Sequence, residues 1–165
     1  MKRLIIIRGN SGSGKSTIAK KVREKAKYND KIAIVEQDYL RRFILKEKEK
    51  ESENNIELIA QTATFALGKG YQVILEGILY SERYLEMLKE LIEKSDESYI
   101  YYLDISLEES LKRHNTKSNK NDFGGKEIRE WYRKMDTLKI TGEKILGEEL
   151  SEDEIVEKIL ADTKL

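Results

Sequence analysis

The stretch of sequence that decides the fold runs from residue 4 to residue 22 and reads LIIIRGNSGSGKSTIAKKV. Its first part, Leu4–Arg8, is apolar through Ile7 and has the length of a buried strand. Ile18 and Val22 begin a helical period. Between them, residues 9–16 fit the pattern G-x-x-x-x-G-K-[ST] in full. Glycines let the backbone curl around an anion, and the positive end of the following helix adds to the attraction. This stretch therefore predicts a strand, a phosphate-binding loop and a helix, in that order.

The side chains of this loop predict how a nucleoside triphosphate binds. Lys15 is expected to reach the β- and γ-phosphates, and the Ser16 hydroxyl is expected to ligate Mg²⁺. We therefore expect ATP and Mg²⁺ as ligands. The residues expected to contact the nucleotide are Gly9, Asn10, Ser11, Gly12, Ser13, Gly14, Lys15, Ser16 and Thr17.

Beyond the loop, strand-like apolar runs alternate with helical periodicity, which predicts an α/β fold with a parallel sheet. Four further strands are expected at residues 32–36, 71–76, 99–104 and 144–146. Helices are expected between them, including two that open with capping boxes at Ser106 and Ser151 and one with an apolar face at Ile128, Trp131, Tyr132 and Met135. The prediction is a three-layer fold of the P-loop nucleoside triphosphate hydrolase type, in which helices flank about five parallel strands and residues 1–165 form one domain.

Composition narrows the function classes. The chain has 165 residues, 31 basic and 31 acidic, so a net charge of zero argues against a dedicated nucleic-acid binder. The absence of cysteine excludes disulfides and thiolate chemistry, and no apolar run approaches the roughly 20 residues of a membrane span. We expect a cytoplasmic protein that has no membrane partner and no obligate protein partner. Two polar segments, residues 46–53 and 115–125, are expected to be solvated loops or helix ends.

Short motifs of two other protein classes also occur in the sequence, but the residues around them do not fit those classes. Residues 119–122 spell N-K-x-D and residues 122–125 spell D-x-x-G, both found in GTPases. The first should end a buried strand, but polar residues precede it, and the second should come many residues earlier. Residues 122–124 also spell D-F-G, but the chain lacks H-R-D and is too short for a protein kinase.

Taken together, the motifs resemble the small-kinase branch of the P-loop superfamily, which includes polynucleotide kinases, chloramphenicol phosphotransferase and zeta-type toxins. One matching stretch, Glu36–Arg41, follows the second expected strand. The resemblance implies that Asp38 is the general base for the attacking hydroxyl and that Arg41 steers the acceptor. From the residues alone, Asp38 is equally well explained as the N-cap of a helix over Tyr39–Leu45, and the two roles can coexist.

A second matching stretch, Val73–Gly77, closes the third expected strand at the position where the Walker B acid stands. The resemblance implies that Glu76 contacts the metal or the acceptor through water, so Ser16 and Glu76 form the expected metal site. Because the usual acid here is Asp, a direct contact between Glu76 and the metal stays open. Gly77 would allow the backbone to approach the site closely.

The third matching stretch, Leu111–Lys117, is similar to the R-x-x-x-R lid of these kinases, with lysine in place of the second arginine. The resemblance implies that Arg113 and Lys117 belong to a mobile cationic lid over about residues 113–125, which orders over the phosphates when the nucleotide binds. His114 is expected to be a helix-end residue, and Phe123 and Trp131 are expected to pack in the core.

The function expected from this resemblance is transfer of the γ-phosphoryl group of ATP to a hydroxyl group. A small-molecule acceptor is favoured, and a nucleoside or the 5′ end of a nucleic acid stays open. Two alternatives also stay open: a nucleotide-dependent switch or assembly ATPase without an acceptor, and a nucleotide-binding domain without turnover. The pair Asp38 and Arg41, together with the basic lid, favours the acceptor kinase, because a switch has no need of them.

Overall fold

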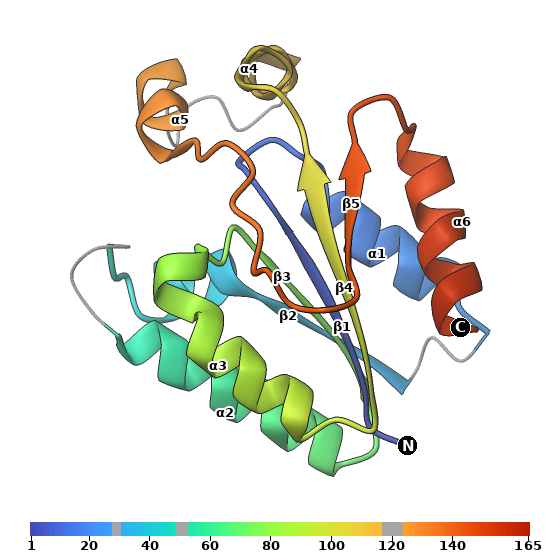
Figure 1. Cartoon of the computed structure of the whole chain (residues 1–165). Helices are drawn as coiled ribbons and strands as arrows, with labels where there is room; N and C mark the ends of the chain where they lie inside the picture. The colour runs from blue at the N-terminus through green and yellow to red at the C-terminus, as the bar shows by residue number, and fades with distance from the viewer. Residues whose placement is uncertain (28–30, 49–52, 117–123) are drawn as a thin grey trace.

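The structure, a computed structural model, describes residues 1–27, 31–48, 53–116 and 124–165 (Figure 1). The order of elements is β1 (Arg3–Gly9), α1 (Lys15–Lys25), β2 (Ile32–Glu36), η2 (Tyr39–Ile44), α2 (Asn54–Gly68), β3 (Gln72–Gly77), α3 (Ser81–Glu93), β4 (Glu97–Asp104), α4 (Leu107–Thr116), α5 (Gly125–Trp131), β5 (Glu143–Gly147) and α6 (Glu152–Thr163). Within these residues, no helix combines the length and apolarity that a membrane crossing requires.

The five strands form one parallel sheet in the order β2-β3-β1-β4-β5. This confirms the expected five-stranded parallel sheet and the α/β fold. Because the strands are parallel, their carboxyl ends meet at one edge, where ligands of such sheets bind. The register places Glu36 of β2 beside Glu76 of β3, and Arg8 of β1 beside Gly77 of β3. The phosphate-binding loop and Glu76 therefore lie at the same edge of the sheet, and Asp38 follows two residues after the end of β2.

Helices cover both faces of the sheet, with α2 and α3 on one side and α1 and α6 on the other (Figure 1). Residues of β1 alternate between the two cores, as expected for a strand buried on both faces. Leu4 and Ile6 pack in the core under α2 and α3, whereas Ile5 and Ile7 pack in the core under α1 and α6. These helices and strands thus enclose β1 from Leu4 onward, and its end carries the loop.

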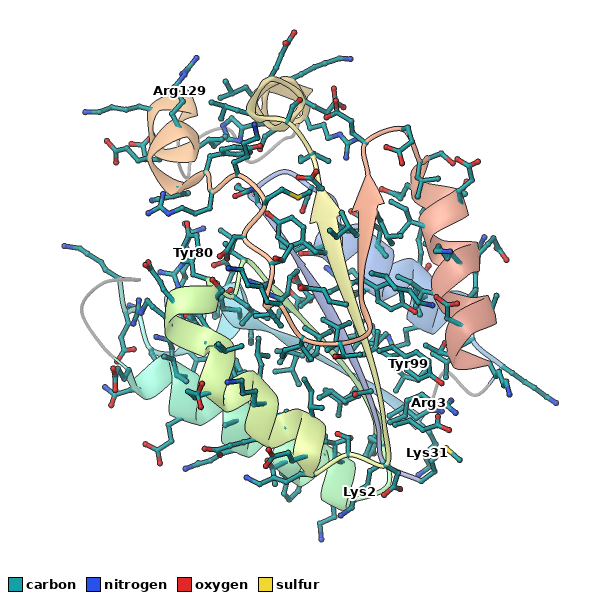
Figure 2. All side chains as sticks on the ribbon, in the orientation of Figure 1. Lys2, Arg3, Lys31, Tyr80, Tyr99 and Arg129 are labelled. Carbon is teal, nitrogen blue, oxygen red and sulfur yellow. The ribbon has the colours of Figure 1, made fainter. Side chains whose placement is uncertain are left out.

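The opposite edge of the sheet is closed by polar contacts near the N-terminus. Arg3 donates to the Glu97 carboxylate at 2.9 Å and to Gln72 Oε1 at 2.8 Å, which ties β1 to its two neighbours. Figure 2 shows Arg3 and Tyr99 at this edge, whereas Tyr80 lies at the far edge, where the strands end. The two edges therefore differ, and the loops at the carboxyl edge are the ones arranged around the site.

Three local predictions need correction. The expected helix over 39–45 is the π-helix η2, and the Asp38 side chain makes no capping hydrogen bond there. Glu109 N donates to Ser106 Oγ as in a capping box, but the Glu109 carboxylate binds Arg113 instead of closing the box. The box at Ser151 is complete on both sides.

The third correction concerns α5, which ends at Trp131, so the apolar face predicted to continue through Met135 is wrong. Tyr132 is extended, and Met135 has a positive φ of 50° and is exposed. The chain leaves the helix here because Arg133 N donates to the Asn10 side chain at 2.9 Å and Asp136 N donates to the Tyr102 hydroxyl at 3.2 Å. Trp131 is half-buried and lies outside both cores.

The alternation of β1 generates a stability prediction. Ile6→Ala removes a fully buried side chain at the centre of the sheet, and we expect the free energy of unfolding to fall by about 2–5 kcal/mol. Ile145→Ala, at a half-exposed position of the edge strand β5, is the control and should cost less than about 1 kcal/mol. Urea unfolding followed by circular dichroism measures both. Equal losses in the two variants would contradict the arrangement of the layers.

Candidate functional site

The phosphate-binding loop begins where β1 ends, at a position that only glycine fits. Gly9 has a φ of +152°, and a Cβ atom built there would lie 2.7 Å from the carbonyl oxygen of Leu103 in β4. Gly14, with a φ of 92°, directly precedes the first residue of α1, Lys15. The loop therefore ends at the amino terminus of a helix, where free N–H groups and the helix dipole favour an anion.

Lys15 is folded back into this loop. Its ammonium group donates to the carbonyl oxygen of Asn10 at 2.9 Å and approaches Ser13 Oγ at 3.3 Å, and the residue is buried. The cation is thus held over the loop backbone. Thr17, two residues further along α1, is exposed.

Ser16 and Glu76 meet at the end of β3. Ser16 Oγ donates to Glu76 Oε1 at 2.7 Å, and Glu76 is buried. Burial raises the pKa of Glu76, the charge of Lys15 and the hydrogen bond from Ser16 oppose this rise, and the nearby negative charges of Glu36 and Asp38 add to it. A hydroxyl and a carboxylate side by side are oxygen ligands of the kind that Mg²⁺ takes beside nucleotide phosphates, so these residues fit the expected metal.

Asp38 and Arg41 form an ion pair at the start of η2. Arg41 Nη2 lies 2.9 Å from Asp38 Oδ1, and Arg41 Nη1 donates to the carbonyl oxygen of Glu47 at 3.1 Å. The Arg41 side chain is mostly buried, whereas that of Asp38 is 58% exposed. The carboxylate therefore faces solvent, is oriented by its arginine, and lies close enough to Glu76 for its charge to act on that group.

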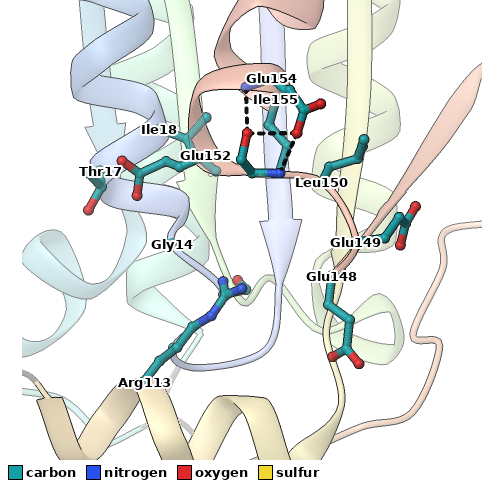
Figure 3. A pocket seen from close by; sticks show the side chains of 13 residues that line it. Gly14, Thr17, Ile18, Arg113, Glu148, Glu149, Leu150, Glu152, Glu154 and Ile155 are labelled. Atoms are coloured by element: carbon teal, nitrogen blue, oxygen red, sulfur yellow. Dashed lines mark hydrogen bonds between the residues drawn. The ribbon is translucent and has the colours of Figure 1, made fainter.

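A pocket of about 470 Å³ opens beside the loop, between α1, α4 and the start of α6 (Figure 3). Gly12 to Gly14, Thr17 and Ile18 form one wall, and residues 148–152 form another. Arg113 extends from α4 into it, and its Nε donates to Glu109 Oε1 at 2.7 Å. Of the predicted lid, Lys117 and Phe123 lie outside the described residues. His114 is buried in the last turn of α4.

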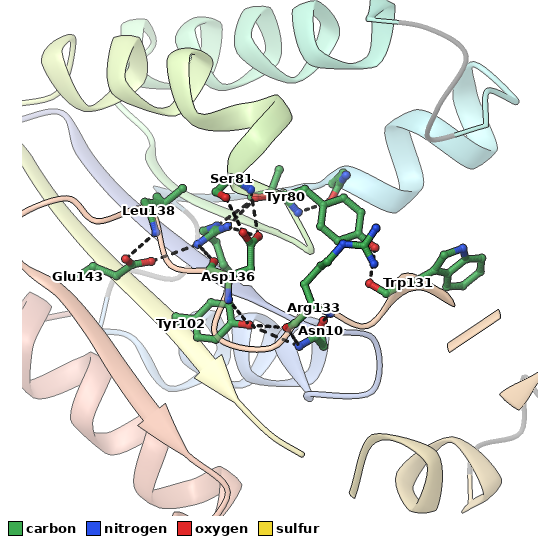
Figure 4. Close-up of polar contacts among 12 residues, drawn as sticks. Asn10, Tyr80, Ser81, Tyr102, Trp131, Arg133, Asp136, Leu138 and Glu143 are labelled. Carbon is green, nitrogen blue, oxygen red and sulfur yellow. Dashed lines mark hydrogen bonds and ion pairs between the residues drawn. The ribbon is translucent and has the colours of Figure 1, made fainter. Parts of the chain in front are cut away.

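A network around Arg8 was not anticipated from the sequence (Figure 4). Its fully buried guanidinium donates to the Leu79 carbonyl at 2.8 Å, to Asp136 Oδ2 at 3.0 Å and to Glu143 Oε1 at 3.1 Å. Burial lowers the pKa of Arg8, and the charges of Asp136 and Glu143 oppose this fall. The sequence does carry one signal, a charged residue that directly follows the apolar run Leu4–Ile7 within the strand.

Asn10 and Gln37 are two further site residues whose side-chain roles were missed. Asn10 Nδ2 donates to the Arg133 carbonyl at 2.7 Å and Asn10 Oδ1 accepts from Arg133 N, which fixes the segment after α5 to the loop. Gln37 is buried, and its atoms occupy the space that a Cβ at Gly77 would fill. The space that Gly77 leaves at the site is thus taken by Gln37, which also accepts from Leu79 N at 3.0 Å.

Comparison with known proteins supports the fold and the loop. A family model described as an AAA domain matches residues 4–138. Among curated protein sequences, none matches this chain.

Solved structures similar to the chain include three kinases. A sugar kinase from Janibacter sp. HTCC2649 has a TM-score of 0.76 at 17% identity over 99% of this chain and 95% of that one. An APS kinase from Mycobacterium tuberculosis, solved with AMPPNP and APS, has a TM-score of 0.75 at 18% identity over 99% and 98%. A gluconokinase from Sinorhizobium meliloti 1021 has a TM-score of 0.68 at 16% identity over 97% and 90%. At these identities the likeness shows a shared fold.

The burial of Glu76 leads to a prediction about stability and pH. Glu76→Gln keeps an oxygen that accepts from Ser16 but removes a buried charge, so we expect the variant to be more stable than the wild type at pH 8. Because the pKa of Glu76 is raised in the folded state, the wild type gains stability as the pH falls towards 4 and Glu76 is protonated. The stability gap should therefore shrink on acidification, as measured by urea unfolding from pH 8 to pH 4.

The matched control is Glu86→Gln, at an exposed position of α3, which should show no such pH-dependent gap. A Glu76→Gln protein that is less stable than the wild type at pH 8, by a margin that grows at low pH, would contradict this assignment.

Proposed function

We propose that this chain, which belongs to the AAA-domain family, is an ATP-dependent phosphotransferase that moves the γ-phosphoryl group of ATP to a hydroxyl group. The observation that carries the proposal is the position of the Asp38–Arg41 pair. The pair follows β2 at the same edge of the sheet as the loop. The negative charge of Asp38 contributes to the raised pKa of Glu76, and Glu76 accepts a hydrogen bond from Ser16. A carboxylate that faces solvent beside a phosphate-binding loop suits an acceptor hydroxyl.

In the proposed mechanism the loop binds the phosphates. Its backbone amides and the start of α1 hold the β- and γ-phosphates, and Lys15 exchanges its contacts with Asn10 and Ser13 for phosphate oxygens. Ser16 and Glu76 would hold Mg²⁺, with Glu76 acting directly or through water. When bound, Mg²⁺ neutralises negative charge on the phosphates. Gly9 to Thr17 are thus the proposed nucleotide-binding residues.

Asp38 is the proposed general base. It orients the acceptor hydroxyl and takes its proton as the hydroxyl oxygen bonds to the γ-phosphorus, while the bond from that phosphorus to the β–γ bridging oxygen breaks. The products are ADP and a phosphate monoester. Arg41 positions the Asp38 carboxylate through the 2.9 Å ion pair and adds positive charge near the acceptor.

Arg113 and Lys117 are proposed to supply positive charge when the lid closes. Arg113 already reaches the pocket beside Gly12 and Gly14, held by Glu109. A cation there would stabilise the transition state, because negative charge builds up on the leaving phosphate as the bond to it breaks. The pocket itself, next to the loop, has room for the nucleoside part of ATP.

A switch ATPase is the second candidate, and one experiment separates it from the kinase. ATP is incubated with the protein, Mg²⁺ and a panel of hydroxyl compounds: sugars, sugar acids, nucleosides, antibiotics and 5′-hydroxyl oligonucleotides. The kinase proposal expects ADP together with a phosphate monoester for one class of acceptor. Release of inorganic phosphate at a rate that no acceptor changes would favour the switch.

Lys15→Ala should abolish phosphoryl transfer while leaving the fold intact, because the ammonium group of Lys15 donates to the loop atoms Asn10 O and Ser13 Oγ and is proposed to exchange them for phosphate oxygens. Radiolabelled ATP measures transfer, and circular dichroism checks folding. Lys20→Ala removes an exposed lysine of the same helix and serves as the control, which should retain activity. Normal turnover in a folded Lys15→Ala protein would contradict the assignment of this loop as the phosphate-binding site.

Asp38→Asn should lower kcat by about 10²-fold or more while the affinity for ATP changes little, because the amide cannot accept the proton. Steady-state kinetics with the acceptor, and calorimetric titration with AMPPNP, measure the two quantities. Asp96→Asn, at the opposite edge of the sheet, is the matched control. An unchanged kcat in this variant would contradict the role of Asp38 as general base and leave it a structural residue of η2.

A further inference from the structure

Two exposed aromatic rings are stacked on η2, immediately after Asp38. The Tyr39 and Phe43 rings have centroids 5.2 Å apart and planes inclined by 13°, and the residues are 51% and 70% exposed. Stacking fixes the two rings in one orientation, yet most of their surface still faces water. Exposing two large apolar side chains at one point opposes folding, which makes the pair a candidate binding surface.

The π-helix places this ring pair beside the proposed catalytic carboxylate. Tyr39 is the residue directly after Asp38. Because residue i of a π-helix bonds to residue i+5, Phe43 lies about one turn beyond Asp38. At a rise of no more than about 1.5 Å per residue, Phe43 lies within about 8 Å of Asp38 along the axis. Leu40, the residue between Tyr39 and Arg41, packs against the core under α2 and α3 and anchors η2. π-Helical turns occur often at functional sites.

A flat ring fits this pair better than a polyhydroxylated one. The two near-parallel rings present a π-surface on which a third ring can stack, and such stacking tolerates any heteroaromatic base. A sugar ring has no π-face to stack on this surface. In a nucleoside, one ribose separates the base from the primary hydroxyl, a separation comparable to the one helical turn between Phe43 and Asp38.

We propose that Tyr39 and Phe43 form a stacking surface for the acceptor, and that the acceptor is a nucleoside, whose base stacks there while its hydroxyl meets Asp38. This inference rests on the proposed function, because it names the acceptor of the same site. It assigns specificity to η2 and leaves the transfer chemistry to the loop, Asp38 and Arg41. Tyr39 and Phe43 are therefore specificity residues and contact only the part of the acceptor that does not react.

The test compares Phe43→Leu, Phe43→Tyr and Tyr39→Leu with the wild type, using adenosine, guanosine, cytidine and uridine as acceptors and gluconate and glucose as comparison compounds. Phe43→Leu should raise the KM for the nucleoside at least tenfold and change kcat less than threefold, because the ring positions the acceptor without touching the reacting atoms. Phe43→Tyr should keep the KM within about threefold. Phe65→Leu, at a position of α2 that is 67% exposed, is the control and should change neither constant.

Binding is measured in parallel by calorimetry, with the P-loop saturated by AMPPNP so that nucleosides report only on the acceptor site. Nucleoside binding that Phe43→Leu weakens and Phe43→Tyr retains supports the inference, even if transfer itself fails. Phosphorylation of gluconate or glucose alone, with a KM that Phe43→Leu leaves unchanged, overturns the nucleoside acceptor but leaves the kinase proposal standing.

Two further results also overturn the inference. One is the absence of any nucleoside binding to the AMPPNP-saturated protein. The other is a dimer in light scattering that Phe43→Leu converts to monomers without changing nucleoside binding, since the rings would then serve a second copy of the chain. Phosphate release from ATP that no acceptor alters would instead remove the proposed function, and the calorimetry would still decide whether the rings bind a nucleoside.

Discussion

Arg8 places a buried guanidinium one residue before the phosphate-binding loop, and the surrounding segments are arranged to satisfy it. A charge in the interior is strongly unfavourable unless it is paired and hydrogen-bonded. The partners come from the turn after β3 through Leu79, from the segment after α5 through Asp136, and from β5 through Glu143. Satisfying this one cation therefore brings three distant parts of the chain to the end of β1.

The same network fixes the loop but leaves the side chains of the proposed acceptor site exposed. Asn10, two residues after Arg8, is bound on both sides of its amide by the backbone of Arg133, so the loop starts from a rigid base. Asp38, Tyr39 and Phe43 are exposed on η2, and Arg113 reaches in from α4. A phosphate-binding loop held by buried hydrogen bonds, beside exposed side chains that we propose contact the acceptor, is the arrangement expected if one loop serves many acceptors across a family and specificity is set nearby.

The parts that the sequence predicted are those determined by local pattern. The strand, loop and helix of residues 4–22 follow from hydrophobic period and glycine positions, and the sheet follows from apolar runs. The proximity of Ser16 and Glu76 could be predicted from the sequence because parallel strands end at one edge of the sheet. The Arg8 network could not be predicted, because Arg8 and its partner Glu143 are 135 residues apart and no local sequence pattern indicates the pairing. The π-helical form of η2 and the early end of α5 likewise depend on tertiary contacts that override propensity.

The most direct measurement of the central claim is ³¹P NMR of ATP consumption by the intact protein with Mg²⁺ and the acceptor panel. The account predicts that ADP appears together with an equal amount of a new phosphate monoester, and that Asp38→Asn forms both more slowly, by about 10²-fold or more, at matched nucleotide occupancy. An equal amount of inorganic phosphate in place of the monoester, formed at the same rate by the wild type and by Asp38→Asn, would contradict it.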